Sequence, residues 1–112
     1  MPDRSFRLKT EIRVRAHIRR CRSEGAFATV ARRGDPDAGA VAIKVYLGAA
    51  TARLFMQSRD LDGRPIWREP FEEARAESEI DARLEKECAI DPDLWIVEIE
   101  DREGRAFLDE AD

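Results

Sequence analysis

The sequence contains few of the residues that build disulfides, metal sites or nucleophiles. Among its 112 residues there are two cysteines and one histidine. Cys21 and Cys88 lie far apart, form no CxxC pair and fall where a helix would turn an apolar face inward, so neither a structural disulfide nor a zinc site is expected. A Cys/His nucleophile would pair His17 with Cys21, which the same pattern directs into the core. We therefore predict no catalytic residue, no metal ligand and no cofactor, and we favour a protein that is not an enzyme.

Long apolar runs and phosphate-binding glycine loops are also missing. No apolar stretch approaches the roughly 18 residues that cross a bilayer, and the basic residues near the start are not followed by the apolar core of a signal peptide. Gly34 and Gly39 match neither the Walker pattern nor the dinucleotide-binding fingerprint. The sequence therefore predicts a cytoplasmic protein with no membrane partner.

What the chain has in excess is charge, and this charge is sorted along the sequence. Charged residues make up 39% of the chain, against about 25% in a typical globular domain. Residues 1–34 contain ten basic and three acidic residues, a balance of +7, so the rest carries −11 in a chain of net charge −4. Such sorting indicates either an anionic partner for one part of the chain or two elements whose opposite charges face each other in the fold.

The length of the chain predicts a single domain over residues 1–112, with fraying expected at residues 1–5 and 109–112. Strict alternation from Phe6 to Ala16 predicts a half-buried strand that gives way to a helix near Val14. Val14, Ile18 and Cys21 then recur at helical spacing, and Gly25 stands where such a helix would end.

The remainder of the chain predicts strands and a second helix. Asp62-Gly63 is typical of a hairpin, and apolar residues repeat every four positions from Glu72 to Cys88, where a helix would begin at Glu72 or only at Ser78. We expect the first four strands to form an antiparallel meander. The predicted strands are 26–32, 40–47, 51–57, 65–68, 94–100 and 105–108. The fold class that follows is α+β: a mostly antiparallel sheet of five or six strands packed against two helices, the first basic and the second acidic.

Two stretches of the sequence resemble a known family. The first runs from Glu24-Gly25-Ala26-Phe27 into residues 32–40 (RRGDPDAGA), and the second covers residues 91–105 (DPDLWIVEIEDREGR). Together they are similar to small bacterial proteins, mainly alphaproteobacterial, known only as a domain of unknown function. The resemblance extends from about Leu8 to Leu108. It implies a single-domain intracellular bacterial protein with no known activity, and it assigns no catalytic or ligand residue.

Arginines of the predicted first helix are the best functional candidates. The planar arginine side chain binds phosphate in a bidentate manner, so arginines on one helix could contact successive phosphates of a nucleic acid, and such binding would weaken steeply with salt. The plainer interpretation, which carries more weight, is a solvated face or pairing with the acidic second helix through Glu73, Glu77, Asp81 or Glu85. The candidate anion- or nucleic-acid-binding residues are Arg13, Arg15, Arg19, Arg20, Arg22, Arg32 and Arg33.

A metal-dependent or hydrolytic enzyme is the alternative from a different class. Asp35 and Asp37 are spaced like a pair of oxygen ligands, and Glu98, Glu100 and Asp101 could approach them in the fold. Aspartates next to proline or small residues are also common turn formers, and this second interpretation is the stronger one.

Ile66 and Trp67 suggest a third possibility. They follow Pro65 on a predicted edge strand, where an exposed edge can pair with a second copy and form a homodimer. Trp95, in contrast, alternates with apolar residues and is predicted to lie in the core. We predict a non-enzymatic cytoplasmic binding or interaction module whose partner is a nucleic acid or an acidic protein. A dimeric accessory protein without a small ligand remains the third alternative.

Overall fold

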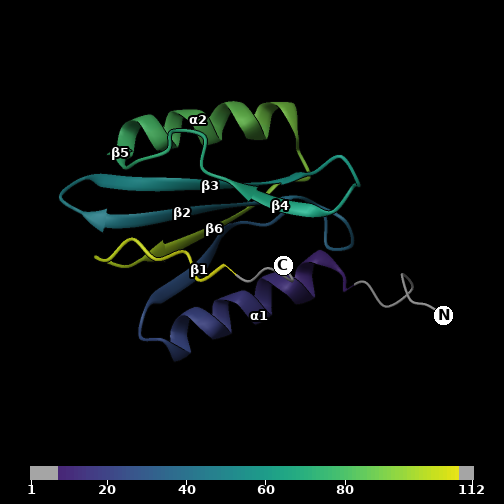
Figure 1. The fold of residues 1–112 in the computed structure, drawn as a ribbon, viewed down its shortest axis with the longest axis horizontal. Coiled ribbons are helices and arrows are strands. Elements are labelled where there is room, and N and C mark those ends of the chain that lie inside the picture. The colour runs from purple at the N-terminus through teal and green to yellow at the C-terminus, as the bar shows by residue number, and fades with distance from the viewer. Residues whose placement is uncertain (1–7, 109–112) are drawn as a thin grey trace.

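The computed structural model describes residues 8–108, which form a six-stranded sheet with one helix packed on each face (Figure 1). The expected fraying at residues 1–5 and 109–112 lies outside the described residues. The elements in chain order are α1 (Thr10–Ser23), β1 (Phe27–Arg32), β2 (Val41–Gly48), β3 (Thr51–Arg59), β4 (Pro65–Arg68), β5 (Arg75–Ala76), α2 (Glu77–Ile90) and β6 (Trp95–Glu100). The predicted α+β class, with a mostly antiparallel sheet and two helices, is confirmed.

Strand order differs from the predicted meander. The order across the sheet is β1-β6-β2-β3-β4, with the short β5 also paired to β3. Only β2, β3 and β4 follow one another as a meander, and the predicted pairing of β1 with β2 is wrong because β6 lies between them, parallel to β2. The physical reason is burial on both faces: Trp95, Ile96 and Val97 are all buried, as expected of a central strand, whereas β1 is largely exposed.

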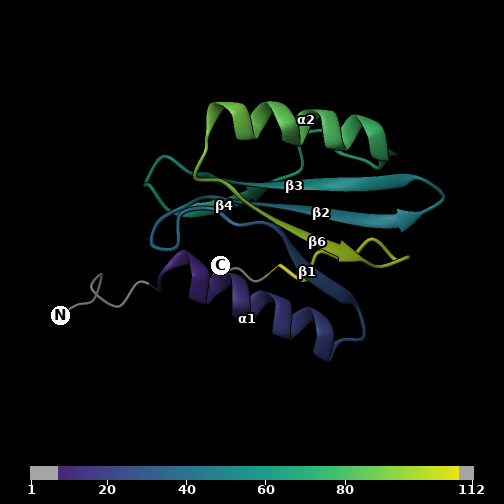
Figure 2. The ribbon, with the colours of Figure 1, turned by 180° about the vertical axis from the view of Figure 1, so that it is seen from behind.

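Alternation along β6 divides the interior into two apolar clusters. Trp95, Val97 and Ile99 face α1 and pack with Val14 and Cys21 of that helix. Side chains of the intervening positions face α2, where Ile96 belongs to the same cluster as Ile80 and Leu84. The two helices therefore lie on opposite faces of the sheet. They also lie toward opposite edges, because α1 runs along β1 and α2 along β3 in both views (Figures 1 and 2).

Both ends of the described chain differ from the predicted strands. Helix α1 already begins at Thr10, so the strand expected up to Val14 is wrong from Leu8 onward, and its earlier residues lie outside the described part. At the other end, residues 105–108 form no strand, and Phe107 has a positive φ of 56°. Helix α2 begins at Glu77, close to the later of the two predicted starts. Over residues 8–108, neither helix is long and apolar enough to cross a lipid bilayer.

Candidate anion-binding face

The loop of residues 33–40, named the clasp loop below, joins β1 to β2 and lies against the start of β6. A Cβ atom at Gly34 would overlap the backbone carbonyl of Asp93 and come within 2.7 Å of the Trp95 ring. At Gly39, a Cβ would overlap the same carbonyl and lie 3.0 Å from the same ring. These two glycines are therefore required by the close approach of the loop to β6, and the sequence RRGDPDAGA has a structural explanation.

The clasp loop also holds the first turn of α1. The backbone N–H of Thr10 donates to the carbonyl of Asp37 at 3.2 Å, and that of Glu11 donates to Pro36 at 2.9 Å. The next two backbone N–H groups donate to the carbonyl of Lys9 at 3.0 and 3.1 Å. The N–H groups of Thr10, Glu11 and Ile12, three of the four that a helix start normally leaves open, thus have protein acceptors. These three backbone donors are not available to an anion, so recognition would rest mainly on side chains.

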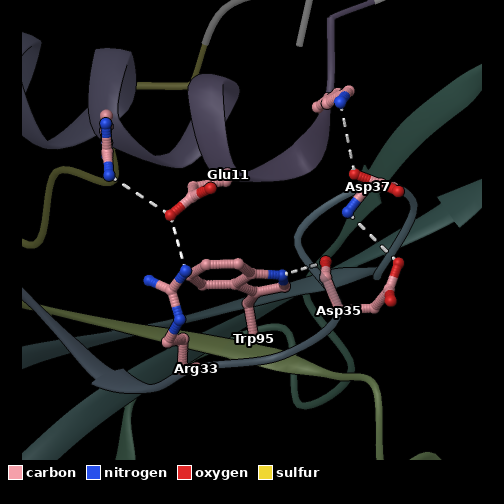
Figure 3. Close-up of polar contacts among 7 residues, drawn as sticks. Glu11, Arg33, Asp35, Asp37 and Trp95 are labelled. Carbon is pink, nitrogen blue, oxygen red and sulfur yellow. Dashed lines mark hydrogen bonds and ion pairs between the residues drawn. The ribbon is translucent and has the colours of Figure 1, made fainter.

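Asp35 acts as the turn former of the clasp loop. Its Oδ2 accepts hydrogen bonds from the backbone N–H groups of Asp37 and Ala38 at 3.2 and 2.8 Å, and its carbonyl accepts one from Trp95 Nε1 at 2.7 Å (Figure 3). Side chain and backbone of Asp35 are both used to shape the loop.

The acidic residues of the predicted enzyme site do not come together. Both loop aspartates lie beside the start of β6 at Trp95, whereas Asp101 follows its other end, about 20 Å away at roughly 3.3 Å per residue. Glu98 lies 3.4 Å from Lys44, and Asp101 is held by Arg105 at 2.8 Å. No group of three His, Cys, Asp or Glu side chains within residues 8–108 is arranged to hold a metal ion.

Glu11 connects two of the candidate arginines. Its Oε2 accepts hydrogen bonds from Arg33 at 2.6 Å and from Arg15 at 3.2 Å, and the Arg33 guanidinium lies over the Trp95 ring, 5.2 Å from its centroid (Figure 3). The hydrogen bond from Arg33 lowers the pKa of Glu11, so this carboxylate is ionised at neutral pH. One carboxylate between two guanidinium groups leaves a net charge of +1. Sequence reasoning missed this role, although Glu11 is the single acidic residue between Arg4 and Arg22.

Four arginines share the outer side of α1 and the adjoining end of β1, and we name them the arginine face: Arg15, Arg19, Arg22 and Arg33. The side chains of Arg15 and Arg33 are 70% and 62% exposed, and Arg19 is exposed on the helix. Arg22 donates to the carbonyl of Ala28 at 2.9 and 3.3 Å, which places it at the edge of β1. A carbonyl orients this guanidinium without cancelling its charge.

The other three candidate arginines are half-buried and contact other groups of the fold. Arg13 donates to the Thr10 hydroxyl at 3.4 Å, and Arg20 donates to the carbonyl of Phe107 at 3.0 and 3.2 Å. Arg32 donates to two backbone carbonyls in the connection between α2 and β6. The structure therefore separates the seven predicted residues into an exposed set of four and a half-buried set of three.

The alternative prediction, that the arginines of α1 pair with the acidic second helix, is wrong. Glu73, Glu77, Asp81 and Glu85 belong to α2 or precede it, and α2 packs on the other face of the sheet. Its counter-charge is Lys44 of β2, whose Nζ lies 2.7 Å from Glu77 and 2.8 Å from Asp81. Burial lowers the pKa of Lys44, but the hydrogen bonds to Asp81 and Glu77 outweigh it, so this pKa is raised overall and the ammonium persists.

His17 and Cys21 are part of the interior. His17 is 7% exposed, and its Nε2 lies 2.8 Å from the carbonyl of Ala106 and 3.7 Å from the Cys21 sulfur. Burial raises the pKa of the Cys21 thiol to about 11, so the nucleophilic thiolate is scarce at neutral pH. This geometry argues against a Cys/His nucleophile.

Strand β4, which carries Ile66 and Trp67, ends the sheet on the side away from β1, as predicted for an edge. Both side chains are half-buried, and Trp67 packs against the apolar cluster beneath α1. The Trp67 indole N–H is buried and has no hydrogen-bond partner among residues 8–108. Their role in an interface stays a prediction.

These observations define a class: a small α+β domain with a mixed sheet between a basic and an acidic helix, and with a glycine-dependent loop that fastens the basic helix. Residues 8–109 match the family described as a protein of unknown function, DUF1491. The chain belongs to this family, which confirms the resemblance seen in the sequence. Among curated proteins, none matches.

Solved structures of the family are similar over nearly the whole chain. A crystal structure of a DUF1491 family protein from Caulobacter crescentus has 50% sequence identity and a TM-score of 0.80, covering 91% of this chain and 95% of that one. An NMR structure of a DUF1491 family protein from the same organism gives 50% identity and a TM-score of 0.79, with 90% and 92% covered. A protein from A. tumefaciens, solved in solution, has 33% identity and a TM-score of 0.75, with 92% and 93% covered. Both organisms are alphaproteobacteria. The family relationship assigns no function.

Proposed function

We propose that this protein is a non-enzymatic cytoplasmic binding module whose arginine face binds the phosphates of a nucleic acid. One observation carries the proposal: the acidic helix lies on the opposite face of the sheet, so it cannot neutralise the arginines of α1. Among residues 8–108, the carboxylate that contacts the arginine face is that of Glu11, and two guanidinium groups share it.

The spacing of these arginines suits a phosphate backbone. Arg15 and Arg22 are seven positions apart, which corresponds to about 10 Å at roughly 1.5 Å per helical residue. A nucleic-acid strand of a duplex carries one phosphate per roughly 3.4 Å of axis, so this length matches about three phosphates. Arg19 lies between the two and is exposed. Arginine side chains can donate two parallel hydrogen bonds to each phosphate.

Fluorescence anisotropy of short labelled RNA and DNA strands, titrated at several salt concentrations, tests the proposal. We expect log Kd to depend linearly on log salt, with a slope of about 0.7 to 0.9 per phosphate contacted. The triple variant Arg15→Ala, Arg19→Ala and Arg22→Ala should reduce that slope by about 2 to 3 and weaken binding at low salt by at least tenfold.

A matched control removes the same charge elsewhere. Arg64, Arg68 and Lys86 are exposed and lie away from α1, on the β3–β4 turn, β4 and α2. Their triple substitution by alanine should leave the salt slope unchanged. Equal losses in the two triple variants would mean that net charge alone governs binding, and flat titrations of the wild type at low salt would reject the proposal.

A homodimer that pairs through β4 is a second candidate, because β4 ends the sheet. Such a dimer would join two sheets edge to edge. Light scattering decides this candidate directly: a monomer mass at high protein concentration removes it.

A further inference from the structure

One half of the sheet face that carries α2 is uncovered within residues 8–108. Helix α2 runs along β3, away from β1 at the far edge of the same sheet (Figure 1). Thr29 pairs with Glu98, and Phe27 pairs with Glu100, so these β1 side chains share the face of Lys44. Phe27 is 59% exposed and Thr29 is exposed. On the opposite face, residues that follow β6, such as Ala106, pack onto the apolar cluster under α1. No described segment covers this half-face in the same way.

A groove of about 390 Å³ follows the boundary between α2 and this open half-face. Its floor is apolar and is contributed by three elements: Ala31 of β1, Ile96 of β6, and Leu84 and Cys88 of α2. Its polar residues are Lys44, Asp81, Glu85 and Glu98. A ligand that fills the groove must therefore combine apolar groups with polar ones.

Negative charge is in excess around this groove. The Lys44 ammonium lies within 2.7 to 3.4 Å of three carboxylates, those of Glu77, Asp81 and Glu98. Glu85, a fourth carboxylate, is exposed and forms no ion pair with any residue the structure describes. Among the residues that line the groove, one ammonium against the three carboxylates of Asp81, Glu85 and Glu98 leaves a local charge of −2, so a cationic group entering the groove would be attracted and an anionic group repelled.

We propose that this groove binds a basic polypeptide segment of a partner protein, in which arginine or lysine side chains alternate with apolar ones. The apolar side chains would contact Ile96 and Leu84, while the cationic groups would pair with Glu85 and Glu98. The proposal is independent of nucleic-acid binding, because it concerns the opposite face of the sheet and a partner of opposite charge. The protein would then join an anionic ligand on one face to a basic protein on the other.

Three labelled eight-residue peptides test the chemistry of the occupant. In the first, arginine alternates with leucine; in the second, arginine alternates with serine; in the third, glutamate alternates with leucine. We expect the arginine–leucine peptide to bind tightest, the arginine–serine peptide at least tenfold more weakly, and the glutamate–leucine peptide not at all. Equal binding of the first two peptides would show that apolar contacts with the groove floor do not contribute to binding, which would reject the proposal. Binding of the third peptide would show that the groove does not select cationic side chains, which would also reject it.

Cys88 provides a probe inside the groove. It is half-buried, whereas Cys21 is 0% exposed, so the thiol reagent DTNB should react with Cys88 in the native protein. Bound arginine–leucine peptide should slow this reaction at least fivefold. Peptide binding without protection of Cys88 would place the peptide elsewhere and overturn the proposal. Protection that instead rises with protein concentration, in the absence of peptide, would assign the groove to a second copy of the chain and would also overturn it.

Two carboxylates are the residues to change. The pair Glu85→Gln and Glu98→Gln preserves side-chain size and should weaken the arginine–leucine peptide at least tenfold. Glu85→Gln alone removes no ion pair among the described residues and should weaken binding of the arginine–leucine peptide about threefold. Glu98 pairs with Lys44 and Glu85 does not, so a loss in the single variant cannot come from disturbance of Lys44. The control pair Asp62→Asn and Glu73→Gln removes the same charge away from the groove and should change nothing. An equal loss in the control pair would reject a specific site.

Discussion

Helices α1 and α2 have the same length, 14 residues each, but opposite charge and different means of attachment. Helix α1 contains five arginines and one glutamate, a balance of +4, whereas α2 contains five acidic and two basic residues, a balance of −3. The acidic helix packs against a buried lysine of the sheet, whereas the nearly buried carboxylate close to the basic helix, that of Asp101, pairs with Arg105 and not with an arginine of α1. The comparison indicates that part of the charge on α2 is used in folding, while most of the charge on α1 remains available to a partner.

The means of attachment differ accordingly. The first turn of α1 is held by backbone carbonyls of the clasp loop, an arrangement that depends on backbone shape and hardly on charge. Helix α2 is joined to β2 through Lys44, an arrangement that depends on charge. Substitutions that alter backbone shape should therefore affect α1, and substitutions that remove charge should affect α2.

Gly34→Ala should produce the largest loss. The added Cβ would overlap the carbonyl of Asp93 and approach the Trp95 ring to 2.7 Å, and neither a backbone carbonyl nor a buried ring can move away easily. We expect the free energy of unfolding, measured by urea titration, to fall by about 3 kcal/mol. Gly63→Ala is the control, because Gly63 has a positive φ of 81° but open space around it. The free energy of unfolding should fall there by about 1 kcal/mol. Equal losses at the two glycines would mean that the clasp loop does not approach β6 as closely as described.

Lys44→Met should produce the next largest loss. Methionine keeps the apolar stem but leaves Glu77, Asp81 and Glu98 without their ammonium, at a side chain that is 9% exposed. Because these carboxylates remain partly solvated, we expect the free energy of unfolding to fall by about 2 kcal/mol. The upper bound is the loss of about 3 to 5 kcal/mol that is typical when a fully buried ion pair is broken.

The pH dependence of the Lys44→Met loss has a definite sign. The pKa of Lys44 is raised in the folded state, so its contribution is complete below its unfolded pKa of about 10.4 and decreases only as the pH rises through the folded value. The difference from wild type should therefore be constant between pH 7 and pH 9. Lys86→Met, on the exposed side of α2, should change stability by less than about 0.5 kcal/mol. A difference that declined already between pH 7 and pH 9 would contradict the assigned pairing.

Local patterns in the sequence predicted most elements but not how they assemble. Strands β1, β2, β3, β4 and β6 were all predicted close to their observed bounds, because alternation and turn residues are local signals. Strand order depends on contacts between distant residues, and the signal that β6 is central, the apolar run Trp95-Ile96-Val97, was read only as alternation. The start of α1 was wrong for a similar reason: carbonyls of Pro36 and Asp37, more than 20 positions away, fix the helix at Thr10.

The candidate site was predictable only in part. The arginines were found from their number and helical spacing, which are local properties. Their partners were not, because Glu11 contacts Arg33 from 22 positions away and Lys44 contacts α2 from more than 30. A lone lysine within the apolar strand VAIKVYL was a usable signal for a buried cation that needs acidic partners. Such a signal identifies the residue, but only the fold identifies which acidic residues meet it.

Glu11→Gln should produce the smallest effect, and it is the change that most sharpens the comparison of the two helices. The substitution removes the single acidic side chain of α1, and with it the carboxylate that Arg15 and Arg33 share. If the arginine face binds phosphates, affinity for a labelled RNA strand should increase roughly twofold to fivefold at low salt, since a competing charge is removed, and the gain should shrink at high salt. Glu79→Gln removes the same charge from an exposed position of α2 and should leave the affinity for RNA unchanged.

The same substitution makes a prediction for stability. Because the pKa of Glu11 is lowered in the folded state, the contribution of Glu11 to stability is present above its unfolded pKa of about 4.3 and disappears as the pH falls through the folded value. The difference in melting temperature between wild type and Glu11→Gln should therefore be larger at pH 7 than at pH 3. A variant that is less stable at pH 7 but binds RNA no more tightly would show that Glu11 and its arginines serve the fold alone.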